Sequence, residues 1–254
     1  MKVKKILGID VGGSGIKGAI VNTKTGKLKT RRYRIPTPEG ATPDDVAAVV
    51  GKIATHFKWT GPIGCGFPAV VRNGIAQTAA NVDKSWIGTN IAQKFEEASG
   101  CPVVVLNDAD AAGMAEMKFG AGKDKNGVVM LFTVGTGIGT VIFSHGKLVP
   151  NTELGHVLLN TMSAEEYASD AVRQNEELSW EEWAGRFNEY LLYMERLFWP
   201  DMMIIGGGMS KKDDKFNDQL TVKTDVIPAK LRNNAGIIGA AVAARLEFKS
   251  RNKH

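Results

Sequence analysis

The stretch ILGIDVGGSGIKGAIV, which runs from Ile6 to Val21, decides how the chain begins to fold. Its glycines at Gly13–Gly18 match the spacing GxGxxG of a dinucleotide-binding turn, in which a helix follows the glycines and receives the pyrophosphate. Here a β-branched run follows instead, and the turn formers at 22–26 leave no room for a helix. The stretch therefore predicts a β-hairpin whose first strand ends at Asp10. Its glycine turn could aim backbone N–H groups at an anion, and a plain hairpin with no ligand is the alternative.

Two further segments repeat the pattern of a strand that runs into glycines. Val128–Val134 enters the loop Gly135–Gly139 and returns as a strand that ends at Phe143, which predicts a second hairpin. Met202–Ile205 enters Gly206–Gly208. Because glycine carries an entropic cost wherever its freedom is not needed, three such loops in one chain favour a functional reason for them.

Strand and helix signals alternate along the rest of the chain. Helical patterns cover 43–57, 91–99, 109–119 and 180–198, and buried strands are expected at 63–67 and 103–106. This alternation is typical of α/β architecture.

Composition excludes several classes of protein. The 254 residues, 43% of them hydrophobic, are enough for one large domain or two lobes with a real core. Cys65 and Cys101 share no CxxC spacing, so we expect two buried thiols. No segment approaches the roughly 20 apolar residues of a membrane span, and the basic N-terminus lacks a secretory pattern, so we expect a cytoplasmic protein with no membrane partner. The net charge of +5 permits an anionic partner, but no nucleic-acid-binding motif accompanies it, so we expect no nucleic acid.

Two short motifs carry side chains suited to chemistry. Asn107 and Asp108 stand where a buried strand ends and a helix begins, the position at which open α/β sheets place ligand-binding residues. Either residue could instead simply cap the helix. Glu153 and His156 lie three residues apart, so one helical turn would put both on one face, and a surface Glu beside a structural His is the alternative.

Five motifs together resemble a known family: IDVGGSGIKGAIV, NDADAAG, TVGTGIGT, ELGH and PDMMIIGGGMS follow the order and spacing of the ROK-family sugar kinases, within the actin-like ATPase superfamily. The segments TAANVDKSW, KLVPNTELGH and IPAKLRN are similar to those of its short polyphosphate-dependent glucokinases. The resemblance covers nearly the whole chain. It implies an α/β, two-lobed actin-like ATPase (ribonuclease H-like) fold, with a small lobe at 1–108 to which the C-terminal helix 236–250 returns, and a large lobe at 109–235.

The resemblance also implies a phosphotransferase that moves the terminal phosphoryl group of inorganic polyphosphate, or of ATP, to the 6-hydroxyl of glucose. By this resemblance Asp108 would be the general base, a role that suits a carboxylate within hydrogen-bond reach of the attacking hydroxyl. The residues that would orient the other sugar hydroxyls are Asn81, Asn107, Glu153, His156 and Glu165. Those that would hold phosphates are Gly12, Gly13, Ser14, Lys17, Gly135, Thr136, Gly137 and Gly207.

The metals implied by the resemblance differ from those of the longer ROK kinases. Asp10 would position Mg²⁺, directly or through water, to offset phosphate charge. Longer members build a zinc site from the His of their GH dipeptide and three cysteines. No cysteine follows His156 over residues 157–163, so we expect no zinc and a His156 that acts only as a sugar ligand. The tail EEYAS at 165–169 keeps the family pattern and aligns Glu165 with the sugar-binding Glu.

The donor and the competing functions follow from the same comparison. The net charge of +5 and the short segment between Ser169 and Trp180 favour polyphosphate over ATP. The alternatives are an ATP-dependent ROK hexokinase for another hexose such as mannose and, less favoured, a sugar-binding regulatory protein. The hairpin after Gly18 argues against an NAD-dependent oxidoreductase, and the short segment before the first strand argues against a DNA-binding repressor. We expect a homodimer.

Overall fold

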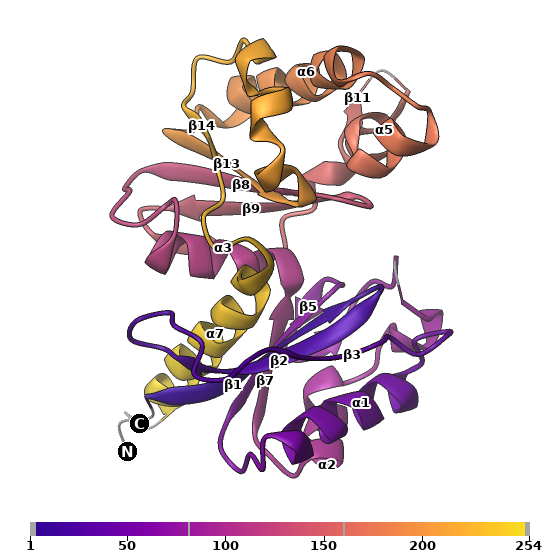
Figure 1. Cartoon of the computed structure of the whole chain (residues 1–254), viewed down its shortest axis with the longest axis vertical. Coiled ribbons are helices and arrows are strands. Elements are labelled where there is room, and N and C mark those ends of the chain that lie inside the picture. Colours follow the sequence, from indigo (N-terminus) through magenta and orange to yellow (C-terminus); the bar gives the residue numbers. More distant parts are fainter. Residues whose placement is uncertain (1–3, 81, 160, 252–254) are drawn as a thin grey trace. The chain divides into compact units, whose positions relative to one another are not determined.

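The computed structural model describes residues 4–80, 82–159 and 161–251 (Figure 1). They form two compact units, the first made of the residues up to Ala115 together with those from Asn234 on, the second of Glu116–Asn233. The division thus falls after Ala115 inside helix α3 (Asp108–Phe119), not after residue 108. The first half of α3 stays with unit 1 because Gly239 of the C-terminal helix α7 (Ala235–Arg251) packs directly on the carbonyl of Ala111.

Unit 1 is built on a five-stranded sheet of order β3-β2-β1-β4-β7. These strands are β1 (Lys5–Gly12), β2 (Gly15–Asn22), β3 (Tyr33–Ile35), β4 (Ile63–Phe67) and β7 (Val103–Asn107). β1 and β2 pair antiparallel with Gly12 opposite Gly15, so the predicted glycine hairpin is confirmed. β4 and β7 run parallel to β1, which brings the carboxyl ends of these three strands to one edge of the sheet.

Helices cover both faces of this sheet (Figure 1). α1 (Pro43–His56) and α2 (Ile91–Ser99) lie on one face, where they bury Phe67, Trp86 and Phe95 in a shared core. α7 lies on the other face at very short range. A Cβ on Gly64 would come within 1.9 Å of the Ala240 carbonyl oxygen, so only glycine allows the helix to rest on the strand backbone.

Unit 2 repeats the arrangement with a sheet of order β10-β9-β8-β13-β14. Its strands are β8 (Val128–Val134), β9 (Ile138–Ser144), β10 (Lys147–Val149), β13 (Met202–Gly207) and β14 (Val226–Pro228). β8 and β9 form the second predicted hairpin, and β13 and β14 extend the sheet in parallel. Helix α6 (Trp180–Phe198) packs Trp183, Phe187 and Tyr190 into the core of this unit.

Shorter elements complete the described parts. They are β5 (Val71–Arg72), β6 (Ile75–Ala76), β11 (Leu158–Leu159), β12 (Met162–Ser163), α4 (Ala164–Ala168), α5 (Asp170–Asn175) and the single-turn 3-10 helices η1 (Lys84–Trp86), η2 (Leu154–His156), η3 (Gly208–Lys211), η4 (Asp213–Lys215), η5 (Asn217–Gln219) and η6 (Arg232–Asn234).

One buried carboxylate ties distant parts of unit 2 together. Glu116 accepts hydrogen bonds from the backbone N–H groups of Ala121, Lys230 and Leu231, at 2.7, 3.1 and 2.7 Å. The side chain is fully buried, so these donors supply the partners that water would otherwise provide. The segment IPAKLRN is therefore fixed in unit 2 by a residue of α3.

Candidate active site

Asn107 and Asp108 stand together at the carboxyl end of β7, but they have different partners. The Asn107 Oδ1 accepts from the backbone N–H groups of Ala109 and Asp110, at 2.9 and 3.1 Å, and its Nδ2 donates to the Ala69 carbonyl at 3.1 Å. Asn107 is thus the residue that caps α3 and anchors it to a loop. The half-buried Asp108 makes a local contact, with its Oδ1 accepting from the Ala109 N–H at 2.8 Å.

Asp10 lies in β1 on the face of the sheet that α7 covers, and the strand continues two residues beyond the predicted end, to Gly12. Its carboxylate is 3.8 Å from the Lys17 Nζ, directly across the hairpin. Burial raises the pKa of Asp10, while the positive charges of Lys17 and Arg32 act in the opposite direction. Gly236 leaves room for this carboxylate, since a Cβ there would come within 2.8 Å of the Asp10 Oδ1.

The glycine turn after Asp10 is held by two side chains that the sequence analysis did not single out. Thr37 donates its hydroxyl to the Gly12 carbonyl, and Arg34 donates from Nη2 to the Ser14 carbonyl. Gly13 and Ser14 themselves are exposed. Because both carbonyls are engaged by the protein, the exposed turn presents its surface to solvent in a fixed shape.

Three predicted sugar-binding residues come together in unit 2. The His156 Nε2 lies 3.4 Å from the Glu153 Oε2, and its Nδ1 lies 3.4 Å from the Glu165 Oε1. Burial raises the pKa of Glu153, and the charge of Glu165 adds to this effect, whereas His156 opposes it. The imidazole therefore bridges two carboxylates, and all three side chains remain partly exposed, at 52%, 42% and 30% for His156, Glu153 and Glu165.

The adjacent glutamates Glu165 and Glu166 have separate roles. Glu166 belongs to a capping box with Ser163, in which its carboxylate accepts from the Ser163 N–H while the Ser163 hydroxyl accepts from the Glu166 N–H. Glu165 instead reaches the glycine loop, where its Oε2 accepts from the Ile138 N–H at 3.3 Å. A Cβ on Gly137 would clash with this carboxylate. Glu165 is therefore the member of the pair that is available to a ligand.

The remaining predicted glycines of unit 2 form one structure. Within the loop, the Gly135 N–H donates to the Gly137 carbonyl at 3.0 Å. Gly207 pairs with Val134, the residue just before this loop, and has a φ of 69°. Its position against the Val134 backbone excludes a Cβ. The end of β13 and the loop after β8 thus meet at the same edge of the second sheet.

Four further expectations concern Asn81, the cysteines, metal binding and membrane spans. Asn81 lies outside the described residues. Cys65 and Cys101 are buried thiols, as expected. Within the described ranges, no group of three or more His, Cys, Asp or Glu side chains is arranged to hold a metal ion. Nor does any helix in those ranges have the length and apolar character needed to cross a membrane.

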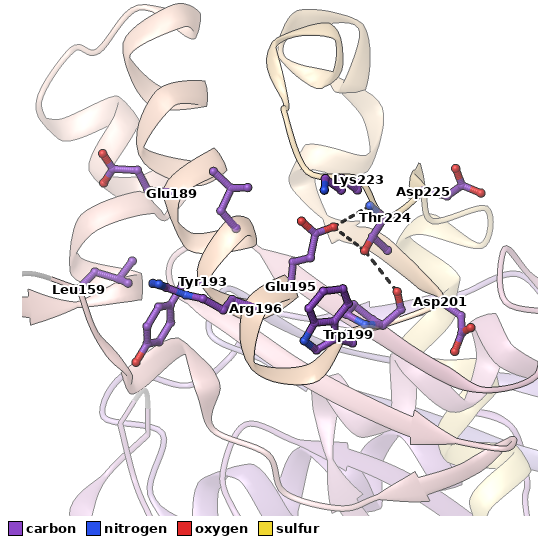
Figure 2. Close-up of a pocket in the computed structure, with 12 residues that line it drawn as sticks. Leu159, Glu189, Tyr193, Glu195, Arg196, Trp199, Asp201, Lys223, Thr224 and Asp225 are labelled. Carbon is purple, nitrogen blue, oxygen red and sulfur yellow. Dashed lines mark hydrogen bonds between the residues drawn. The ribbon is translucent and has the colours of Figure 1, made fainter.

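A hollow in unit 2 is lined by none of the predicted site residues. Figure 2 shows this space of about 790 Å³, which lies beside the last turns of α6. Glu195 accepts there from the N–H and hydroxyl of Thr224, both at 2.7 Å. Trp199, which ends α6 with a φ of 46°, is 79% exposed at the rim. The hollow is therefore a surface feature and no part of the candidate active site.

Comparison with known proteins places this geometry in a family. The polyphosphate glucokinase of Mycobacterium tuberculosis (strain CDC 1551 / Oshkosh) is 48% identical over 238 residues, which cover 93% of this chain and 90% of that protein. The crystal structure of inorganic polyphosphate/ATP-glucomannokinase from Arthrobacter sp. strain KM aligns with a TM-score of 0.93 at 44% identity, over 96% of this chain and 99% of that one. A ROK family glucokinase from Streptomyces griseus, in complex with glucose and AMPPNP, aligns with a TM-score of 0.80 at 25% identity, over 95% and 99%.

These likenesses confirm the expected fold class, the two-lobed actin-like ATPase fold of sugar kinases. The ROK family model matches residues 6–171, which include both glycine hairpins, the Asn107–Asp108 pair and the Glu153–His156–Glu165 cluster. The chain belongs to the ROK family.

Proposed function

We propose that this chain is a polyphosphate glucokinase, which transfers the terminal phosphoryl group of inorganic polyphosphate to the 6-hydroxyl of glucose and releases glucose 6-phosphate. Relatives of 44–48% identity along 93% of the chain bear the name polyphosphate glucokinase. The observation that carries the proposal is the position of Asp108, a partly exposed carboxylate at the carboxyl end of β7 whose helix is already capped by Asn107.

Asp108 is proposed to act as the general base. Its carboxylate accepts the proton of the sugar 6-hydroxyl while that oxygen attacks the terminal phosphorus of the donor, and the shortened polyphosphate leaves with the bonding electrons. Such a base contributes on the order of 10²- to 10⁴-fold to the rate. Asn107 supports the geometry, because its three hydrogen bonds hold the first turn of α3 against the loop at Ala69.

Glu153, His156 and Glu165 are proposed to orient the sugar, together with Asn107 and Asn81. The imidazole can donate a hydrogen bond through a ring N–H and the two carboxylates accept hydrogen bonds, which together suit hydroxyl groups of a hexose, since each hydroxyl both donates and accepts. Fixed partners of this kind lower the entropic barrier of the reaction by holding the 6-hydroxyl in place.

The two glycine turns are proposed to hold donor phosphates. The residues of the turns are Gly12, Gly13, Ser14, Gly135, Thr136 and Gly137, and Lys17 of β2 and Gly207 of β13 are proposed to act with them. Backbone N–H groups in such turns form anion-binding concavities. The Asp10 carboxylate, in the space that Gly236 leaves open, fits the donor set of a magnesium ion, which binds through one or two carboxylates, water and substrate phosphates. When bound, Mg²⁺ would neutralise charge on the donor phosphates.

The donor and the sugar are tested in one experiment. Glucose and mannose are each supplied with long-chain polyphosphate or ATP, with Mg²⁺, at two ionic strengths. We expect glucose with polyphosphate to give the highest kcat/KM and to lose most at high salt, because salt screens the attraction between a polyanion and a chain of net charge +5. Higher kcat/KM with ATP at both ionic strengths would contradict the donor assignment. The glucomannokinase name of the Arthrobacter relative makes mannose and ATP the second candidates.

We also propose that two copies pair through the exposed face of α6. This α6 face consists of Glu189, Leu192, Tyr193, Arg196 and Trp199, all of which line the hollow in Figure 2. Leu192 and Trp199 are 38% and 79% exposed, and aromatic residues at such sites are enriched in interfaces. Glu189 and Arg196 are two helical turns apart on one face. A twofold axis near Leu192 and Tyr193 would therefore set each Glu189 against the Arg196 of the second copy.

The pairing is tested by exchanging these charges. Arg196→Glu should weaken the dimer in sedimentation experiments, and the double change Glu189→Arg with Arg196→Glu should restore it. Lys211→Glu, an exposed charge reversal elsewhere in unit 2, is the matched control. A monomeric wild type at micromolar concentration, or a double variant that dimerises no more tightly than the single one, would contradict the interface.

We also propose a cytoplasmic location, since both cysteines are free thiols.

A further inference from the structure

One row of residues crosses the whole sheet of unit 1. The strand registers place five residues level with one another: Arg34, Lys17, Asp10, Gly66 and Leu106. Asp108 follows two residues after Leu106, at the end of the row. Since neighbouring strands lie about 4.8 Å apart, Asp10 and Arg34 are separated by about 10 Å. The row therefore runs from the proposed base, past the proposed metal ligand, to the edge strand β3.

The charged members of this row share one face of the sheet. Ile9 and Gly18 form a pair that faces α1, because a Cβ on Gly18 would meet the Ile53 side chain. Side chains alternate along strands, so the next pair, Asp10 and Lys17, faces the opposite side.

Arg34 pairs with Lys17 and lies on the same side as it. Its guanidinium lies where a side chain on Gly15 would be, and Nη2 donates to the Ser14 carbonyl. Tyr33 points the other way and stacks on His56 of α1, with ring centroids 3.7 Å apart. Arg32 lies just before β3, and its positive charge acts on Asp10, which places it near the same end of the row.

Lys17 and Arg34, the two cations of this row, are accessible to an anionic ligand. Arg32 and Arg34 are exposed, and Lys17 is 29% exposed at its side chain. Among the described residues, no carboxylate lies within ion-pair distance of Arg34, which donates to the neutral Ser14 carbonyl. The ion-pair contact of Lys17 within the described ranges is the 3.8 Å one with Asp10. Arginine guanidinium groups bind phosphate oxygens in pairs of parallel hydrogen bonds, so the edge at β3 offers strong phosphate ligands next to the glycine turn.

We propose that Lys17, Arg34 and Arg32 form a track for the tail of the polyphosphate chain, whose terminal phosphoryl group lies toward Asp108. The inference rests on the proposed function and extends it from the reacting phosphates to those that follow. ATP has only three phosphates, after which a ribose and a base follow. Polyphosphate continues as an unbroken anion and can occupy the outer positions at Arg34 and Arg32. The track therefore favours the longer donor.

The test compares two variants that remove the same charge from unit 1. Arg32→Gln with Arg34→Gln removes the outer track. Lys52→Gln with Lys58→Gln removes two exposed cations on or just after α1, which covers the opposite face of the sheet. Arg32→Gln alone is included because it leaves the bond from Arg34 to Ser14 in place. Each protein is assayed for binding of labelled long-chain polyphosphate without glucose, and for kcat/KM with long-chain polyphosphate, tripolyphosphate and ATP.

The track predicts that polyphosphate binds about 2- to 30-fold more weakly to the double arginine variant, the range expected for the loss of two exposed charge contacts. The loss in kcat/KM should be largest with long chains and smaller with tripolyphosphate and ATP. Equal losses in the lysine control, or equal losses with all three donors, would overturn the track. The binding measurement separates this inference from the proposed function. A protein that phosphorylates no glucose would refute the proposed function. Its binding of polyphosphate would still support or refute the track.

Discussion

Replacing Asp108 by Asn should lower turnover strongly while leaving the fold intact. The amide has nearly the shape of the carboxylate and keeps an oxygen that can accept the 2.8 Å hydrogen bond from the Ala109 N–H. It cannot take the proton of the sugar hydroxyl at neutral pH. Loss of a general base lowers turnover by roughly 10²- to 10⁴-fold, which corresponds to about 2.7–5.4 kcal/mol of activation free energy.

The structure also gives the control for this experiment. Asn107 makes three hydrogen bonds that define the start of α3, so Asn107→Ala should cost about 1–2 kcal/mol of folding stability, the typical loss of an N-cap. In a protein of this size that lowers Tm by about 2–8 °C. Asp108→Asn should change Tm by much less, because the cap remains.

The assay measures glucose 6-phosphate formation at saturating glucose and polyphosphate, alongside thermal unfolding of each variant. Low turnover with an unchanged Tm for Asp108→Asn, and a lowered Tm for Asn107→Ala, is the expected pair of results. Near-normal turnover in Asp108→Asn would refute the base assignment. A fall in Tm equal to that of Asn107→Ala would show instead that Asp108 serves the helix start.

Other changes test the remaining residues. Glu165→Gln should raise KM for glucose by about tenfold, because hydrogen bonds to a charged group are lost. Glu166→Gln should weaken only the start of α4, so similar KM values for the two variants would contradict the assignment. Lys17→Met should raise the pKa of Asp10 further, because Lys17 lowers it, and should therefore move the acid limb of the rate profile with polyphosphate to higher pH. Gly64→Ala should destabilise unit 1 by about 1–3 kcal/mol or more in denaturant melts by pushing α7 off the sheet. Activity with Mg²⁺ should survive a zinc-selective chelator, and metal analysis should find no stoichiometric zinc.

Local chemistry made much of the fold predictable from the sequence. The helix at Pro43 begins where Thr42 caps it, and the helix at Ile91 ends at Gly100, whose φ of 65° is easily adopted by glycine. The hairpins were predictable because no helix could follow their glycines. The capping role of Asn107 was an open alternative that its hydrogen bonds now make definite.

Contacts between distant residues could not be predicted in this way. Glu116 receives the N–H of Lys230 across 114 residues, and Arg34 reaches Ser14 across 20. Neither is part of a periodic pattern, since each depends on how strands and helices pack after they form. The division of α3 after Ala115 has the same origin, because it is decided by the packing of Gly239 on Ala111.

The repeated sheet order explains why the functional motifs recur at the ends of strands. In both units the first strand has its hairpin partner on one side, followed by a third strand antiparallel to that partner, and two strands parallel to the first lie on its other side. Parallel strands bring their carboxyl ends to one edge, so a residue placed just after any of them reaches that edge without a special loop. In unit 1 these positions hold the glycine turn after β1 and Asp108 after β7, and in unit 2 they hold the loop after β8 and Gly207 at the end of β13. The motifs are therefore spaced along the chain as the strands are. The few polar side chains at these strand ends distinguish a phosphotransferase from a protein of the same topology that has no catalytic residues there.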